Sequence, residues 1–245
     1  MPIRRSPAPA VPSASDLRKK LHAHASPEDA VFLQRFFKTG AGQYGEGDRF
    51  IGVRVPDMRR VCREGRGASL ATIRSLLRSP IHEERALALM LLVQAFQTSD
   101  EEGRRTIYET YLAHTRDINN WDLVDLSAGA IVGGWLDRRS RAPLSRLARS
   151  RLLWERRIAI IATFHFIRRG ELAETFRIAD LLLRDTHDLI HKAVGWMLRE
   201  AGKRDGAALR EFLRERYRSM PRTMLRYAIE RFPEEERRRY LKGLV

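Results

Sequence analysis

The chain has 245 residues and a formal net charge of +15, from 46 basic against 31 acidic side chains. Its length suits one domain or two small ones, and its 43% hydrophobic content is enough for a sizeable core. Such an excess of positive charge favours an anionic partner, either nucleic acid or an acidic membrane surface. The single cysteine, Cys62, excludes an intrachain disulfide and a cysteine-based zinc site.

The first residues differ in composition from the rest of the chain. Segment 1–15 is rich in Pro, Ala and Ser and lacks the apolar core of a signal peptide, so we expect a flexible tail. No run of 18 apolar residues follows it, and we expect a cytoplasmic protein without a membrane span. Residues 16–245 are then expected to form a single helical domain.

Beyond residue 16 the sequence has a helical pattern almost everywhere. Apolar residues recur at spacings of three and four, and no convincing alternation of apolar and polar residues indicates a strand. The exception is the glycine-rich segment 40–52, which predicts a loop followed by a helix start at 55–57. This loop matches neither common glycine-rich phosphate-binding motif, so we assign it no phosphate.

The helical pattern is also repetitive. Four similar segments each hold a cation at the aligned position: Arg85, Arg157, Lys192 and Arg226. These cations are 72, 35 and 34 residues apart, and the midpoint of the first spacing is Trp121. A period near 35, with two helices in each unit, predicts an all-α, HEAT-like helical-repeat solenoid. An irregular helical bundle is the alternative.

Equivalent positions in successive repeats line one surface of a solenoid, usually the concave one, and here that surface would be basic. Segment 138–157 adds eight arginines and only one acid, Glu155. A basic concave groove is expected of a protein that follows a phosphate backbone. For any single arginine, a solvated helix face is the alternative.

The segment Trp121-Asp122-Leu123-Val124-Asp125 holds the best candidates for chemistry. Trp121 and Asp125 are four residues apart, so on a helix they share one face. A carboxylate on a basic groove is unusual, because it repels the phosphates that the arginines attract. The alternative is structural, with Asp125 paired to a neighbouring arginine and Trp121 in the core.

Several stretches of the chain together carry a family resemblance. From FFKTGAGQYGEGDRFIGVRVP through NNWDLVDLSAGAIVGGWL and ERRIAIIATFHFI to HKAVGWMLRE, the sequence resembles the bacterial DNA alkylation repair family typified by the AlkD glycosylase. The likeness covers most of residues 30–235. Its most specific parts are the WDxVD core and the KAxGWxLRE stretch.

The resemblance implies a fold, a substrate and a site. It implies a HEAT-like solenoid that holds duplex DNA in a basic concave groove. Such proteins excise cationic alkylpurines, 3-alkyladenine and 7-alkylguanine, without flipping the lesion into a pocket as other glycosylases do. By motif, the catalytic carboxylate is Asp125, its two flanking indoles are Trp121 and Trp196, and an arginine shared by the group is Arg157. We expect a monomer that needs no cofactor or metal.

A single carboxylate suits this chemistry. Hydrolysis of an ordinary glycosidic bond usually needs two carboxylates, one of which protonates the leaving group. An N-alkylated purine already carries that positive charge, so no general acid is needed. One carboxylate can stabilise the oxocarbenium-like sugar and orient water, and aromatic faces add cation–π attraction.

Further cations are candidates for DNA contacts. Lys192, Trp196 and Arg199 fall at i, i+4 and i+7 and share a helix face. We expect five cations to contact phosphates without reading the base sequence: Arg157, Lys192, Arg199, Arg85 and Arg226. The alternatives are a core role for Trp196 and a local ion pair of Arg199 with Glu200 or a neighbouring helix.

Other functions and sites remain open or are excluded at this point. His187 and His191 are spaced like two metal ligands, but no third ligand follows from the sequence and we expect no metal. Two other functions remain possible: a non-catalytic solenoid that recognises distorted or branched DNA, and a helical-repeat adaptor for an acidic protein.

Overall fold

A computed structural model describes residues 11–245 of the chain. The regular elements of the described residues are all helices, without a strand, and the one isolated β-bridge joins Arg49 and Ile81. The all-α prediction is therefore confirmed. In the same residues no helix is both long and apolar enough to cross a membrane.

The chain separates into two compact units, which we call unit 1 (Met1–Ser99) and unit 2 (Asp100–Val245). Each unit has its own apolar core, with Leu21, Leu76 and Leu87 fully buried in unit 1 and Leu123 and Ile158 fully buried in unit 2. The expected single domain over residues 16–245 stays a prediction.

Unit 1 holds the first five helices, in chain order α1 (Ala14–His22), α2 (Pro27–Phe36), α3 (Val55–Glu64), α4 (Leu70–Leu77) and α5 (His82–Thr98). Helix α1 begins inside the expected tail, because the Ser13 side chain caps it by accepting the Asp16 N–H at 3.1 Å. Residues 1–10 of that predicted tail lie outside the described residues.

The glycine-rich segment between α2 and α3 is a loop, and α3 starts at Val55 as predicted. Glu83 of α5 holds the end of the loop. Its buried carboxylate accepts hydrogen bonds from the backbone N–H groups of Ile51, Gly52 and Val53 at 2.8–3.2 Å. Gly52 has φ +82°, and a Cβ there would lie 2.0 Å from the Ser26 carbonyl oxygen. Only glycine fits this close approach.

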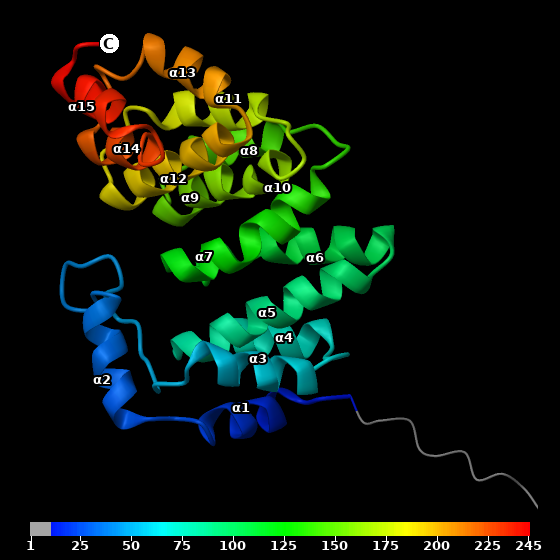
Figure 1. Ribbon diagram of the computed structural model, residues 1–245. Coiled ribbons are helices and arrows are strands. Elements are labelled where there is room, and N and C mark those ends of the chain that lie inside the picture. Colours follow the sequence, from blue (N-terminus) through cyan, green and yellow to red (C-terminus); the bar gives the residue numbers. More distant parts are fainter. Residues whose placement is uncertain (1–10) are drawn as a thin grey trace, which may run out of the picture. The chain divides into compact units, whose positions relative to one another are not determined.

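Unit 2 runs from green to red in Figure 1. Its helices are α6 (Glu101–Ala113), α7 (Trp121–Ala128), the π-helix η1 (Gly129–Gly133), α8 (Ala142–Ala148), α9 (Leu153–Ala162), α10 (Phe164–Ile167), α11 (Ala173–Leu182), α12 (Asp188–Arg204), α13 (Gly206–Arg214), α14 (Arg222–Ala228) and α15 (Glu234–Lys242).

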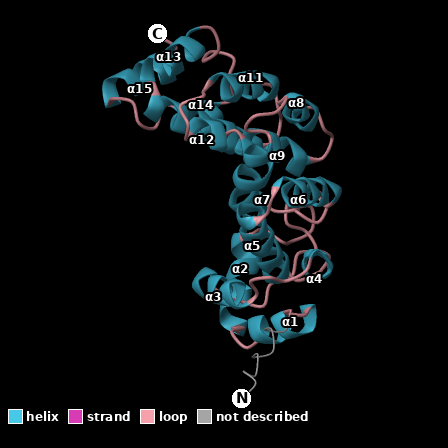
Figure 2. Ribbon diagram, turned by 90° about the vertical axis from the view of Figure 1, so that its right-hand side faces the viewer, coloured by secondary structure: helices cyan, strands magenta, loops and turns pink. Residues whose placement is uncertain are grey.

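The helices of unit 2 form two rows. In one row α7 packs on α9, α9 on α12, and α12 on α14. In the other, α8 packs on α11, and α8, α11 and α13 cover α9 and α12 (Figure 2). This succession of paired helices agrees with the helical-repeat prediction rather than with an irregular bundle. The row α7, α9, α12, α14 carries the aligned positions Trp121, Arg157, Lys192 and Arg226.

Two glycines allow close packing against helices of this row. A Cβ on Gly195 of α12 would lie 2.5 Å from the Met224 carbonyl oxygen and 2.5 Å from the Tyr227 Cβ. A Cβ on Gly133 of η1 would lie 2.4 Å from the Ala162 carbonyl oxygen. The backbones of α12 and η1 therefore approach their neighbours as closely as glycine permits.

Candidate active site

Helix α7 is held at both ends. Asn120 is fully buried, and its side-chain oxygen accepts the Trp121 N–H at 2.8 Å. Near the other end, the Tyr111 hydroxyl of α6 lies 3.0 Å from the Ser127 hydroxyl, which donates to the Leu123 carbonyl at 2.6 Å. The helix therefore presents its first turns in a fixed orientation.

Asp125 of α7 is paired with Arg157 of α9. Arg157 donates from Nε to Asp125 Oδ1 at 2.9 Å and from Nη2 to Oδ2 at 2.8 Å, a bidentate arrangement. The Arg157 side chain is 5% exposed, whereas that of Asp125 retains 17% exposure. The carboxylate is thus fixed by the protein, and the side chain is not covered completely.

The charge state of Asp125 reflects two opposing effects. Burial raises the pKa of the Asp125 carboxyl above its ordinary value, and the positive charge and hydrogen bonds of Arg157 oppose that rise. Asp122, one turn earlier, adds a further upward push on this pKa by charge repulsion. The pair therefore holds a carboxylate that is less shielded by water than a surface aspartate.

Arg157 also links the pair to the next helix of the row. Its Nη1 donates to the Leu189 carbonyl at 2.6 Å, in the first turn of α12. Trp196 lies seven residues further along α12, about two turns away. One arginine therefore ties together the three helices that carry Asp125, Arg157 and Trp196.

Trp196 is half-buried and makes two defined contacts. Its indole Nε1–H donates to Glu200 Oε1 at 3.2 Å, and its ring lies 6.2 Å from the Phe164 ring, centroid to centroid. Trp121 is also half-buried, at the N-terminal end of α7 and on the Asp125 side of that helix. Neither indole is part of the fully buried core.

A family model described as DNA alkylation repair enzyme matches residues 17–232, most of the chain. The chain belongs to this family.

A solved structure from Enterococcus faecalis, named as a predicted DNA alkylation repair enzyme, has the same fold as this chain. The TM-score is 0.66 at 16% sequence identity, over 86% of this chain and 98% of that one. At this identity the likeness shows the fold alone. No curated protein matches the sequence.

The structure corrects the expected role of Arg85. This side chain is buried in unit 1, where it donates to Asp48 Oδ1 at 2.6 Å and to the Ser79 carbonyl at 2.9 Å. Asp48 also contacts His82 Nδ1 at 2.8 Å. The Arg85 guanidinium is therefore neutralised inside the fold, and we do not retain it among the phosphate contacts.

Arg157 and Arg199 also differ from expectation. Both belong to the row of helices that carries the site, but their guanidinium groups are held by acids: Arg157 by Asp125, and Arg199 by Glu230 and Glu200. The ion pairs named as alternatives for Asp125 and Arg199 are thus present in the structure, and the roles of both residues stay predictions. In this structure neither guanidinium group is available to bind a phosphate.

The remaining two cations are more accessible. Lys192 is 41% exposed and lies 2.8 Å from Asp188, one turn earlier on α12. Arg226 of α14 is exposed, and no acidic side chain within residues 11–245 pairs with it. These two stay our candidates for phosphate contacts.

The two histidines at the start of α12, the N-cap residue His187 and His191, are used locally. His187 Nδ1 accepts the Leu189 N–H at 3.1 Å, and His191 Nε2 contacts the Asp185 carbonyl at 2.5 Å. Within the described part of the chain, no three His, Cys, Asp or Glu side chains are grouped as metal ligands.

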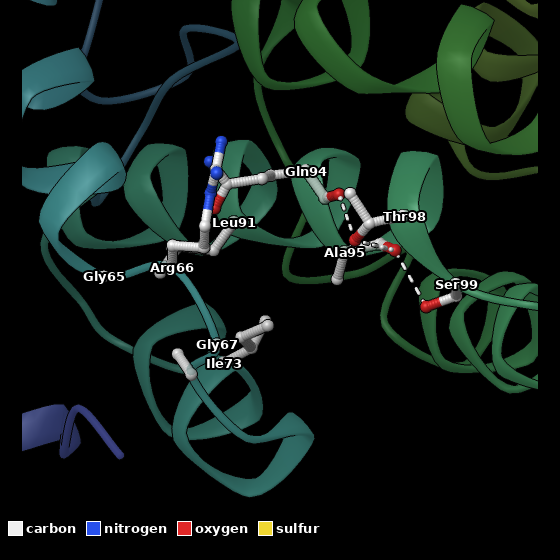
Figure 3. A pocket seen from close by; sticks show the side chains of 10 residues that line it. Gly65, Arg66, Gly67, Ile73, Leu91, Gln94, Ala95, Thr98 and Ser99 are labelled. Atoms are coloured by element: carbon white, nitrogen blue, oxygen red, sulfur yellow. Dashed lines mark hydrogen bonds between the residues drawn. The ribbon is translucent and has the colours of Figure 1, made fainter. Parts of the chain in front are cut away.

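Unit 1 contains a pocket of its own. It has a volume of about 110 Å³ and lies between the end of α3 and the second half of α5 (Figure 3). The hydroxyls of Thr98 and Ser99 in its wall donate to backbone carbonyls of α5 at 2.8–3.3 Å. These two hydroxyls are therefore satisfied within the helix itself.

Sequence reasoning missed the residues that support the site. Asn120 caps α7, Gly195 sets the approach of α12 to α14, and Glu200 holds the Trp196 indole. Asn before a helical run is a recognisable cap signal. The other two depend on contacts between helices or on side-chain orientation, which no local pattern specifies.

Proposed function

We propose that the protein is a DNA glycosylase that hydrolyses the N-glycosidic bond of cationic alkylpurines in duplex DNA, such as 3-alkyladenine and 7-alkylguanine. The observation that carries the proposal is the Asp125 carboxylate. It is fixed by Arg157 at 2.8 and 2.9 Å, and its side chain is largely buried but keeps 17% exposure. The chain that carries this carboxylate belongs to the DNA alkylation repair family.

The lesion supplies part of the chemistry. Its ring already carries a positive charge, so the base leaves as a neutral purine without protonation. Positive charge then builds on the sugar. Each Asp125 oxygen has two lone pairs and gives one to Arg157, which leaves the other to face the sugar cation or to orient the attacking water.

The other residues bind and position the DNA. We assign Trp121 and Trp196 to cation–π contacts with the lesion or its sugar, without extrusion of the base into a pocket. Lys192 and Arg226 contact phosphates and position the strand. Arg157 is a positioning residue that holds the carboxylate. The protein acts on DNA as a monomer.

A second function is favoured by one observation. Both Asp125 oxygens already accept hydrogen bonds from Arg157, as they would in a purely structural ion pair. The same surface would then bind distorted or branched DNA without cleaving a bond.

The test is base release from a duplex that carries one 7-methylguanine, with a parallel duplex that carries 3-methyladenine. Release of either base supports the glycosylase. Tight, salt-sensitive binding without release of either base contradicts it and supports the second function. Neither release nor binding would point to an adaptor for an acidic protein.

A further inference from the structure

Trp196 and Glu200 lie one turn apart on the same face of α12. The indole Nε1–H of Trp196 donates to Glu200 Oε1 at 3.2 Å. An indole has a single polar hydrogen, so this bond restrains rotation of the ring plane. The orientation of the indole therefore depends on where the Glu200 carboxylate is held.

The Glu200 carboxylate is itself fixed by cations. Lys203 donates to both of its oxygens, at 2.7 and 2.9 Å, and Arg199 approaches Oε1 at 3.4 Å. Arg199 is anchored on its other side by Glu230, just beyond α14. The Glu200 side chain is only 15% exposed. These contacts form a connected series of charged side chains that ends at the indole: Glu230, Arg199, Lys203 and Glu200.

The backbone and the ring edge of Trp196 are also restrained. The preceding residue, Gly195, lies against the backbone of α14 with no room for a Cβ. The Phe164 ring, tilted by 38°, lies 6.2 Å from the indole ring, centroid to centroid. A helix, an aromatic ring and a charged acceptor therefore fix the indole together, although its surface is only half-buried.

We infer that Glu200 is a positioning residue that holds the plane of the Trp196 indole, so that its face meets the lesion or its sugar. The inference rests on the proposed function. A carboxylate on the N–H also draws that proton outward and leaves the ring richer in electrons, which strengthens its attraction for a cation. Glu200 thus acts on the reaction through Trp196 and touches no reacting atom.

The first test needs no DNA. In a 15N-labelled protein the four tryptophans give four indole N–H signals, and Trp196→Phe identifies the one from Trp196. Glu200→Ala should shift that signal and speed its exchange with water, because the hydrogen bond is lost. Glu200→Gln should leave it near its original position, because an amide oxygen still accepts the bond. Glu211→Ala, which removes an exposed partner of Arg214, is the matched control and should change nothing.

The second test is single-turnover release of 7-methylguanine. Glu200→Ala should lower the rate constant about tenfold with the Kd for the duplex unchanged, since misplacing a positioned group slows the chemical step. Glu200→Gln should recover most of the rate. A merely structural role would instead lower the melting temperature and the binding of DNA together, and that result would overturn the inference.

The two tests separate the inference from the function. An unchanged Trp196 signal in Glu200→Ala, or a shifted signal with an unchanged excision rate, overturns the role of Glu200 while leaving the glycosylase intact. Wild-type protein that binds the duplex but releases no alkylated base overturns the proposed function, and with it any role of Glu200 in the reaction. In that case a shifted signal still shows that Glu200 holds the indole.

Discussion

The ion pair of Asp125 and Arg157 balances two opposite demands on one carboxylate. A group that stabilises a sugar cation works best away from water, but burial disfavours its charged form. Arg157 compensates through two hydrogen bonds to the same carboxylate. The Asp125 side chain nevertheless keeps 17% exposure, so this ion pair does not cover it completely.

The pH dependence of excision follows from this balance. Burial raises the pKa of Asp125, so the acid limb of the single-turnover pH–rate profile should lie above the ordinary aspartate value of about 3.9. The rate should fall as the pH is lowered through that pKa, because protonation removes the negative charge. Arg157→Gln removes the opposing positive charge and should move this limb to higher pH. An acid limb that Arg157→Gln leaves in place would mean that another group controls the rate.

Arg85 offers a second prediction, on stability rather than activity. It is buried beside Asp48, so Arg85→Leu leaves an acid buried with one partner fewer. The free energy of unfolding should drop by about 3–5 kcal/mol, the usual cost of breaking a buried ion pair on one side. Urea unfolding measures this loss of stability. The control is Arg105→Leu, which breaks the exposed Arg105–Glu109 pair. Equal effects of the two substitutions would show that the Asp48 cluster does not stabilise unit 1.

At the residue scale, the sequence identified the candidates but not their partners. Asp125 and Trp121 stood out because a helix spacing of four places them on one face. Their identification with a glycosylase site came from the family resemblance. The partner of Asp125 lies 32 residues away, and only the packing of α7 on α9 brings the two together. Arg85 shows the same limit, since a repeat alignment does not tell whether a cation faces water or a buried acid.

The packing of α12 on α14 depends on Gly195. Gly195→Ala places a methyl group 2.5 Å from the Met224 carbonyl oxygen, and the neighbour is backbone that cannot move alone. We expect the free energy of unfolding to fall by about 1–3 kcal/mol, the usual cost of overpacking. Excision should fall as well, because Trp196 follows Gly195 directly.

Gly129→Ala is the matched control for this substitution. Gly129 has helical backbone angles, and a Cβ there meets nothing closer than 3.7 Å. Alanine should therefore leave stability unchanged or raise it by about 0.5–1 kcal/mol. If both alanine variants unfolded at the same urea concentration, the close approach of α12 and α14 would not be a requirement of the fold.

At the element scale, periodicity predicted most of what is observed. The helical class, the loop before α3 and the start of α3 at Val55 agree with the structure. The π-helix after α7 did not follow from the sequence, because GAIVG fits an α-helical pattern equally well. It arises where Gly133 presses against the α9 backbone, which is a tertiary contact.

For the whole molecule, the excess positive charge predicts salt-sensitive binding to duplex DNA. The logarithm of the binding constant should fall linearly with the logarithm of salt concentration, with a slope of about −0.9 for each phosphate neutralised. Arg226→Ala should make this slope shallower by about 0.9, the contribution of one phosphate contact. Arg214→Ala, on α13 in the other row of helices, is the matched control and should leave the slope unchanged. Equal slopes for wild type and Arg226→Ala would remove Arg226 from the interface.

The repeat period was informative at this scale because it depends on the whole chain rather than on one contact. It placed Trp121, Arg157, Lys192 and Arg226 on equivalent helices, and in unit 2 these helices are successive members of one row. The period does not specify which side chains remain free for DNA. Arg157 is used within the protein and Arg226 is not, although both occupy the same repeat position.

The role of Asp125 is tested most directly by comparing wild type and Asp125→Asn on one duplex that carries 7-methylguanine. Release of the base and the Kd are measured in parallel, and circular dichroism verifies folding. We predict that the wild type releases the base and that Asp125→Asn is slower by at least about a hundredfold, the scale of losing one electrostatic stabiliser. DNA affinity should stay the same or rise slightly, because a negative charge leaves the surface. Full excision by a folded Asp125→Asn variant would contradict the role of this carboxylate.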